Sequence, residues 1–426
     1  MGMKKHLFAL LSVSIISLSA CGGSADNNDN DFKRRLDSKV EGKVTVRGHY
    51  ENFEALTDEF HNFNKIYPNI QLNYEYDKDH KKNIELALNG DTPPDIFFTY
   101  STLDFAKLDS YTEDLSAKDI GFEFDLDCVR EGLLYKDKNG KVPYFPVFTT
   151  SYGMLVNENL FKKYNVKIPT TYEELKTACA AFKNVTDKKI YPMLGHESMV
   201  MYPLYFPHFC GTLLNNPDKV EALNNMSIGA GENMRSSLEL AKDFMSKGYV
   251  DVNECTTNIA DDYDKTIKRF YEGDVAMMLA KGGTVSGTEK RESQSEAFTK
   301  NPFKYSFHPV PSTAQGGYFY NTVDLCFSIN KNSMNLNLAN EFMRFLISSK
   351  RLNRMAKAKR MITPCKDMTF DNIYSAFGKI KEDHIIIPSQ IGLSDAADKQ
   401  VRKAGTAVCL KNMSVDDAIA NYGNFE

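Results

Sequence analysis

Segments with the spacing of strands alternate with segments with the spacing of helices near the start of this chain. Residues 43–46, 70–74 and 95–99 are rich in β-branched and aromatic side chains, as strands are. Between them, residues 56–67 and 84–88 carry apolar side chains at helical spacing. The run at 95–99 is apolar almost throughout, which suits a strand covered on both faces. This order predicts a parallel α/β sheet with crossover helices.

The same alternation starts again in the middle of the chain. Met234, Leu238, Ala241 and Met245 mark one face of an amphipathic helix there. A length of 426 residues has room for two or three domains of ordinary size, so a second α/β unit is expected. In the rest of the chain, strands are predicted at 152–157, 275–279 and 323–329 and helices at 172–182, 232–246 and 338–347.

The N-terminal segment indicates the compartment. Two lysines precede an apolar run at 7–17 that is too short to span a bilayer, and small residues lead from it to Cys21. The block resembles a bacterial lipoprotein signal, which implies a signal peptide at 1–20, lipidation of Cys21 and a polar tether at 21–42. We therefore expect a protein anchored outside the cytoplasmic membrane, on a Gram-positive cell surface rather than in a periplasm.

Charge and cysteine usage exclude several classes of function. Residues 1–20 carry two lysines and no acidic residue, so their removal changes the net charge from −4 to −6. This mildly acidic net charge does not indicate the basic surface that binds nucleic acid. The seven cysteines after Cys21 are spread without a Cys-x-x-Cys pair and lie mostly in apolar patterns. We read them as core residues and predict neither a metal site nor a particular disulfide.

Five motifs resemble those of family 1 extracellular solute-binding proteins of ABC importers. They follow one another in the family's order from residue 43 onward. Thr170 or Thr171 is expected to cap the helix that begins in the third motif, with Glu174 closing its first turn. Tyr172 stands there in place of the family's tryptophan. The motifs are 89–97 (NGDTPPDIF), 142–144 with 155–161 (VPY and LVNENLF), 168–175 (IPTTYEEL), 270–277 (FYEGDVAM) and 339–346 (ANEFMRFL).

The resemblance implies a two-lobed, type II periplasmic-binding-protein-like α/β fold, with a ligand cleft between lobes that are joined by crossing strands. The N-terminal lobe would comprise residues 43–148 plus 313–350, and the C-terminal lobe residues 149–312 plus 351–426. Such a protein captures a solute by lobe closure and delivers it to the permease subunits of an ABC importer. It needs no cofactor, and we expect none.

Candidate ligand-binding residues lie just after strands and where the chain crosses between lobes, because open α/β sheets bind ligands beyond the carboxyl ends of their strands. Within the second lobe, a loop at 196–197 and a turn at 282–284 belong to this group. The candidates are Tyr50, Glu51, Thr99, Tyr100, Ser101, Thr150, Glu197, Tyr202, Gly283, Thr284, Tyr320 and Asn321.

Carboxylates, amides, hydroxyls and tyrosines among these candidates favour a carbohydrate, since sugars offer many hydrogen-bonding groups and apolar faces. No arginine cluster points to phosphate or sulfate. The chain departs from sugar-binding members in having no tryptophan, so tyrosines would have to stack on the ligand. A non-sugar solute and an exported glycan-acting enzyme are the alternatives. The sequence lacks the Gly-x-Ser-x-Gly and His-Glu-x-x-His motifs, and we expect a binding protein without catalytic residues.

Overall fold

The computed structural model describes residues 31–100, 108–118, 121–260, 262–286 and 288–426. Residues 31–34 fall in a short N-terminal unit and form no helix or strand, whereas residues 35–426 form a second compact unit. The predicted signal peptide, Cys21 and Ser101 lie outside the described residues. Within the described ranges, no helix is both long and apolar enough to cross a membrane.

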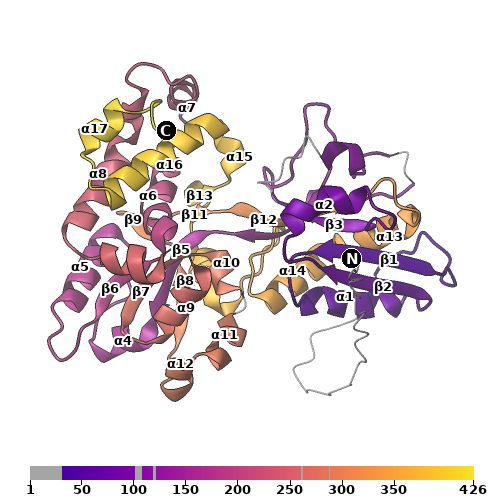
Figure 1. The fold of residues 1–426 in the computed structure, drawn as a ribbon, viewed down its shortest axis with the longest axis horizontal. Coiled ribbons are helices and arrows are strands. Elements are labelled where there is room, and N and C mark those ends of the chain that lie inside the picture. The colour runs from indigo at the N-terminus through magenta and orange to yellow at the C-terminus, as the bar shows by residue number, and fades with distance from the viewer. Residues whose placement is uncertain (1–30, 101–107, 119–120, 261, 287) are drawn as a thin grey trace, which may run out of the picture. The chain divides into compact units, whose positions relative to one another are not determined.

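A five-stranded mixed sheet forms the first lobe. Strand β1 runs parallel to its neighbours β2 and β3, whereas β12 is antiparallel to β3 and β4. This confirms the parallel order predicted for the first three strands. Figure 1 shows helices α1 (Glu54–Asn64) and α2 (His80–Leu88) beside them. The strands lie in the order β2 (Ile70–Tyr76), β1 (Gly42–Gly48), β3 (Ile96–Thr99), β12 (Thr322–Ile329) and β4 (Phe145–Thr150).

Aromatic side chains pack helices of the first lobe against one another. Phe63 of α1 contacts Phe342 and Phe345 of α13 (Leu336–Leu346), with both pairs of ring centroids 5.2 Å apart. Helix α14 (Ser349–Lys359) packs against α1. The predicted helix to residue 67 is shorter in the structure: α1 ends at Asn64, and a turn follows in which the amides of Ile66 and Tyr67 both donate to the carbonyl of Phe63.

A four-stranded sheet forms the second lobe. Strand β6 is parallel to β7, and β5 is antiparallel to both β7 and β8. The strands predicted at 152–157 and 275–279 are therefore confirmed. Their spatial order is β6 (Tyr191–Gly195), β7 (Val275–Lys281), β5 (Tyr152–Asn157) and β8 (Tyr305–His308).

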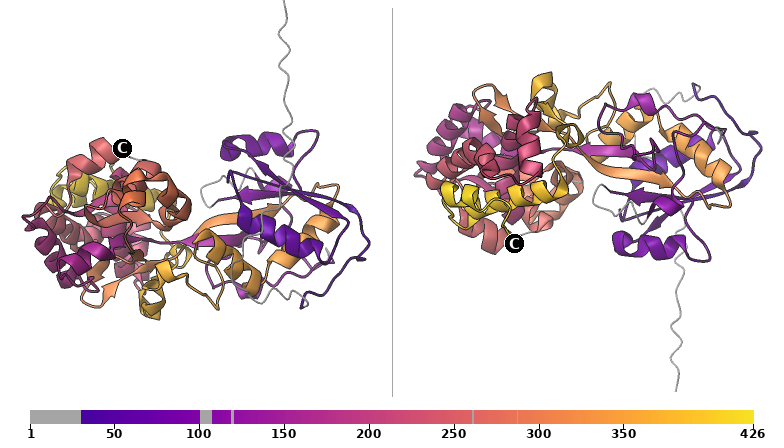
Figure 2. Two further views of the ribbon diagram at one scale, coloured as in Figure 1. Left: turned by 90° about the horizontal axis from the view of Figure 1, so that it is seen from below. Right: turned by 90° about the horizontal axis from the view of Figure 1, so that it is seen from above.

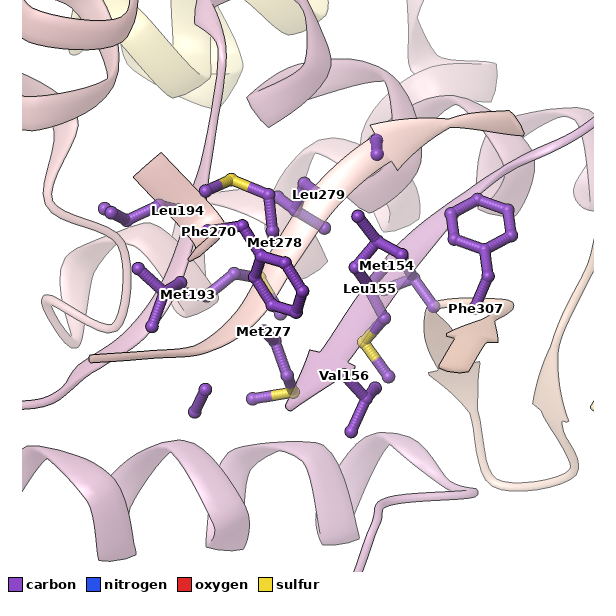
Figure 3. Packing of buried hydrophobic residues seen from close by; sticks show 14 of the residues in the cluster. Met154, Leu155, Val156, Met193, Leu194, Phe270, Met277, Met278, Leu279 and Phe307 are labelled. Carbon is purple, nitrogen blue, oxygen red and sulfur yellow. The ribbon is translucent and has the colours of Figure 1, made fainter. Parts of the chain in front are cut away.

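The central position of β7 explains why its residues are apolar. Every residue from Val275 to Ala280 is fully buried. Figure 3 shows Met277 and Phe270 together with side chains from neighbouring β5 and β6. Unbranched methionines fill irregular gaps in such a core. Because both faces of β7 are covered, the strand reads as a continuous hydrophobic run.

Helices surround the second sheet. Figure 2 shows in both views that the C-terminal helices lie with the magenta and rose helices of this lobe, and α16 contacts α6 and α8. Helix α8 begins later than predicted, because a 3-10 turn covers Ala230–Met234. The helices are α4 (Glu158–Lys163), α5 (Tyr172–Lys183), α6 (Glu197–Leu213), α7 (Pro217–Asn224), α8 (Arg235–Ser246), α9 (Tyr263–Tyr271), α10 (Gly282–Val285), α11 (Thr288–Gln294), α12 (Glu296–Lys300), α15 (Pro388–Ile391), α16 (Asp395–Leu410) and α17 (Val415–Ala420).

Two stretches of chain link the sheets. Ser151 alone separates β4 of the first sheet from β5 of the second. The return path runs through the short strands β9 (Pro311–Thr313), β10 (Gly316–Gly317) and β11 (Phe319–Tyr320) into β12. Strand β11 pairs with β13 (Ile385–Ile386). The lobe boundaries proposed from the sequence stay a prediction, but the crossings place candidate site residues at the junction of the two sheets.

Candidate ligand site

The ends of β1 and β3 bring three ring side chains together. His49 lies 4.4 Å from Tyr50 and 5.2 Å from Tyr100, measured between ring centroids. The Tyr100 hydroxyl makes a hydrogen bond with Nδ1 of His49. Burial, with a smaller effect from neighbouring His80, lowers the pKa of His49 to about 4. His49 is therefore neutral near pH 7 and offers one donor and one acceptor.

The carboxylate of Asp324 in β12 acts electrostatically on this group. Burial has the largest effect on the pKa values of His49, Tyr50 and Tyr100. The negative charge of Asp324 contributes a smaller increase to each of these values. Its side chain is 19% exposed and lies 3.5 Å from the Nζ of Lys281, at the end of β7. The ion pair therefore joins an element of the first sheet to an element of the second.

The segment after β7 lies close to this ion pair. A Cβ atom added at exposed Gly283 would stand 4.0 Å from an oxygen of Asp324. A Cβ atom at Gly282 would collide with the hydroxyl of Thr150, 2.4 Å away. These glycines allow the start of α10 to approach the crossing at Thr150. The predicted turn at 282–284 is a short helix, because the amide of Ser286 donates to the carbonyl of Gly282.

A second aromatic group begins at Tyr152, which is opposite Lys281 in the β5–β7 ladder. Its ring centroid lies 5.7 Å from that of Tyr202 and 5.3 Å from that of Tyr320. The guanidinium of Arg402 lies 4.9 Å from the Tyr202 ring centroid. Tyr152 and Tyr202 are half-buried and keep part of their surface accessible. These tyrosines thus continue the group of polar and aromatic side chains around Asp324 into the second lobe.

Several predicted residues lie in the interior. Thr99 is fully buried and faces the Ser328 hydroxyl at 3.4 Å across the sheet, so it holds the sheet together. Tyr320 is 5% exposed and Asn321 is fully buried. Within the described part of the chain, the side-chain amide of Asn321 has no hydrogen-bond partner, nor do the Thr150 and Thr284 hydroxyls.

The structure says less about the remaining candidates, which are Glu51, Glu197 and Ser101. Glu51 is exposed beside Tyr50. The predicted loop at Glu197 is instead the first residue of α6, because His196 adopts the extended N-cap conformation. The side chain of Glu197 and the whole of Ser101 are outside the described structure. Ligand contact by any of the candidates stays a prediction.

Sequence reasoning did not select Asp324, Lys281 or Tyr152. Asp324 is the one charged residue of its strand, TVDLCFSI, and that charge was the available signal. Lys359 was also missed, and its ammonium group lies 4.7 Å from the Tyr50 ring centroid. These side chains come from distant segments, so their convergence depends on the tertiary fold.

A separate cavity of about 350 Å³ lies on the second lobe. It is lined by His308, Pro309, Pro311, Gln315 and other residues, and it contains none of the predicted site residues. Its lining combines prolines with Lys379, Lys381, His308 and His384.

Comparisons with known proteins identify relatives of the chain. Melibiose/raffinose/stachyose-binding protein MelE of Bacillus subtilis is 24% identical over 215 residues, which are 49% of this chain and 48% of that protein. The match thus spans about half the length of this curated relative. Among solved structures, RafE from Streptococcus pneumoniae in its apo form aligns with a TM-score of 0.65 and 16% identity, covering 92% of this chain and 99% of RafE.

A Bacillus licheniformis sugar transporter in complex with stachyose gives a TM-score of 0.59 and 19% identity, covering 89% of this chain and 97% of that one. These likenesses support the two-lobed fold. The family model described as bacterial extracellular solute-binding protein matches residues 59–380. Since that range is most of the chain, this protein belongs to the bacterial extracellular solute-binding protein family.

Proposed function

We propose that this protein is the solute-binding subunit of an ABC importer and that it captures an oligosaccharide between its lobes. Family membership supports the class of function. MelE is named for binding melibiose, raffinose and stachyose, and solved relatives carry raffinose or stachyose. The observation that carries the proposal is the ion pair of Asp324 and Lys281, which joins the two sheets among tyrosine rings.

The chemistry of this cluster suits a sugar. An ionised carboxylate such as Asp324 accepts charge-assisted hydrogen bonds from sugar hydroxyls. The half-buried rings of Tyr152 and Tyr202 offer apolar faces to sugar C–H groups. Tyrosine rings would take the stacking role that tryptophan has in other sugar-binding members.

The proposed mechanism is capture by lobe closure. Because Asp324 and Lys281 belong to different sheets, a ligand that contacts both has its highest affinity for the closed arrangement. Ligand then shifts the population toward closure. Rotation about the crossings near residues 147–151 and 310–312 would permit this. A permease recognises the closed form, and a separate subunit hydrolyses ATP.

The proposed location is the outer side of the cytoplasmic membrane. Lipidated Cys21 would anchor the chain, and a Gram-positive cell surface fits the polar tether better than a periplasm does. Labelling with radioactive palmitate tests this anchor. Wild-type protein should incorporate the label, and Cys21→Ser should not.

Thermal shift against a ligand panel tests the function. The panel contains raffinose, stachyose, melibiose and mannobiose, together with monosaccharides, amino acids and polyamines. A ligand at one hundred times its Kd should add about 2.7 kcal/mol of stability. Stabilisation by oligosaccharides supports the proposal, and stabilisation by another class alone would replace the sugar with that solute. Release of reducing ends from a glycan would instead indicate the glycan-acting enzyme.

Asp324→Asn tests the site. It removes the charged acceptor and leaves side-chain size nearly unchanged, so we expect Kd to rise at least tenfold, or about 1.4 kcal/mol. Gln315→Ala is the matched control, because Gln315 lines the separate cavity. Calorimetric titration of both variants measures the difference. Unchanged affinity in Asp324→Asn with weakened binding in Gln315→Ala would move the ligand to that cavity.

A further inference from the structure

Two of the free cysteines contact each other at the edge of the first lobe. Cys128 ends the 3-10 turn η2 (Leu126–Cys128), and Cys365 follows α14. Cys128 is 9% exposed and Cys365 is fully buried. Their thiols are placed for a side-chain hydrogen bond with each other.

The backbone holds the two segments in register. Val129 and Cys365 are partners in an antiparallel bridge. The amide of Lys366 donates to the carbonyl of Cys128 at 2.8 Å, and the amide of Arg130 donates to the carbonyl of Pro364 at 3.0 Å. Cys128 is offset by one position from Val129, the direct partner of Cys365, so spacings of about 3.4 Å along a strand and 5 Å across it place the two cysteine Cα atoms about 6 Å apart, within the range that a disulfide spans. Cys128 ends a 3-10 turn, so its side chain does not follow the alternation of faces that a strand imposes.

The thiols also influence one another's ionisation. Their contact raises the pKa of Cys128, with burial adding to the effect, and lowers the pKa of Cys365. Disulfides persist in extracellular proteins, where no cytosolic reductant acts on them. An extracellular solute-binding protein with two adjacent thiols meets that condition.

We propose that Cys128 and Cys365 form a disulfide when the chain folds outside the cytoplasm. The oxidant is a low-molecular-weight disulfide. The sulfur of one cysteine attacks this disulfide and forms a mixed disulfide, releasing one thiol. The sulfur of the second cysteine then displaces the other thiol of the oxidant. Overall, the cysteines lose two electrons and two protons, and the oxidant gains them and leaves as two thiols.

The bond would restrain an irregular part of the first lobe. The described residues between η2 and β4 contain turns but no strand. Backbone hydrogen bonds to Pro364 and Lys366 attach the start of this segment to the chain that follows α14. Helix α14 in turn packs on α1. A covalent link adds to these bonds by reducing the freedom of the unfolded chain.

Peptide mapping of the full-length protein tests the proposal. The protein is unfolded with reductant, refolded in a mixture of oxidised and reduced glutathione, blocked with iodoacetamide and digested. We expect one linked peptide pair that contains Cys128 and Cys365, lighter than the reduced pair by two hydrogen atoms. The oxidised protein should also have a higher Tm than the reduced protein.

Variants assign the link. Cys128→Ala and Cys365→Ser should each lose the linked peptide and the Tm difference between redox states. Cys179→Ala, a buried cysteine of the second lobe, should keep both. If a variant does not fold, the peptide map of the wild type still decides. Two free thiols at these positions after oxidative refolding, or a link to another cysteine, would overturn the proposal.

Discussion

At the scale of single residues, burial separates candidates that can contact ligand from those that hold the lobes together. Tyr202 keeps part of its surface exposed, whereas Tyr320 is enclosed by Phe206 and Tyr152. Both tyrosines belong to the same aromatic group. Their substitution should therefore have different consequences.

Tyr320→Ala should lower the free energy of unfolding by about 3–5 kcal/mol, because it leaves a cavity where a large ring was packed. Tyr202→Ala should cost less stability and weaken sugar binding instead. Urea denaturation and calorimetric titration measure the two effects. Normal stability in Tyr320→Ala would mean that its ring does not support the core.

At the scale of elements, the packing of α14 on α1 includes one strongly buried ion pair. Arg354 donates two hydrogen bonds to Glu59, at 2.6 and 2.5 Å, and the Glu59 side chain is 1% exposed. Removing one member of such a pair leaves a charge without its partner in the interior. This contact secures α14 against α1.

Glu59→Ala should lower the free energy of unfolding by about 3–5 kcal/mol. Glu296→Ala is the matched control, since its pair with Lys300 is exposed and exposed pairs contribute at most about 1 kcal/mol. Chemical denaturation of both variants gives the comparison. Equal effects would show that the buried pair is no stronger than the surface pair.

Capping at α5 illustrates how far local sequence can reach. Thr171 caps the helix by accepting from the amide of Glu174 at 3.3 Å, and Glu174 accepts from the amide of Thr170 at 2.8 Å. The predicted cap is confirmed, with Thr171 as the capping residue. Thr171→Ala should cost about 1 kcal/mol in a denaturation experiment. Thr177→Ala on the same helix is the control and should change stability by less.

At the scale of the whole molecule, buried histidines connect stability to pH. Burial lowers the pKa of His49, His208 and His308 to about 4, from an ordinary value of 6.5. Between those values the unfolded chain binds protons that the folded chain does not. Stability is therefore greatest above pH 6.5 and falls as the pH drops toward 4.

Urea denaturation at pH 7, 5.5 and 4.5 should show this decline. Each unit of pKa difference corresponds to about 1.4 kcal/mol, so a loss of several kcal/mol is expected by pH 4. His308→Gln should have a shallower dependence, because one of the three groups is gone. A flat profile across this window in the wild type would contradict the assignment.

The sequence by itself determined the order of strands and helices and the family. It could do so because these depend on patterns within one segment: alternation at 43–46, the cap at Thr171, and the continuous apolar run of β7. Apolar side chains at every second position predict a strand, and apolar side chains at helical spacing predict a helix.

Only the tertiary structure decided which distant residues meet. Asp324 and Lys281 lie on strands of different sheets, and the two cysteines at 128 and 365 meet through a single antiparallel bridge. Periodicity carries no information about such pairs, because their contact follows from the crossings of the chain between the sheets. Tertiary packing also buried Asn321 and Thr99, which the sequence had placed among the ligand-binding candidates.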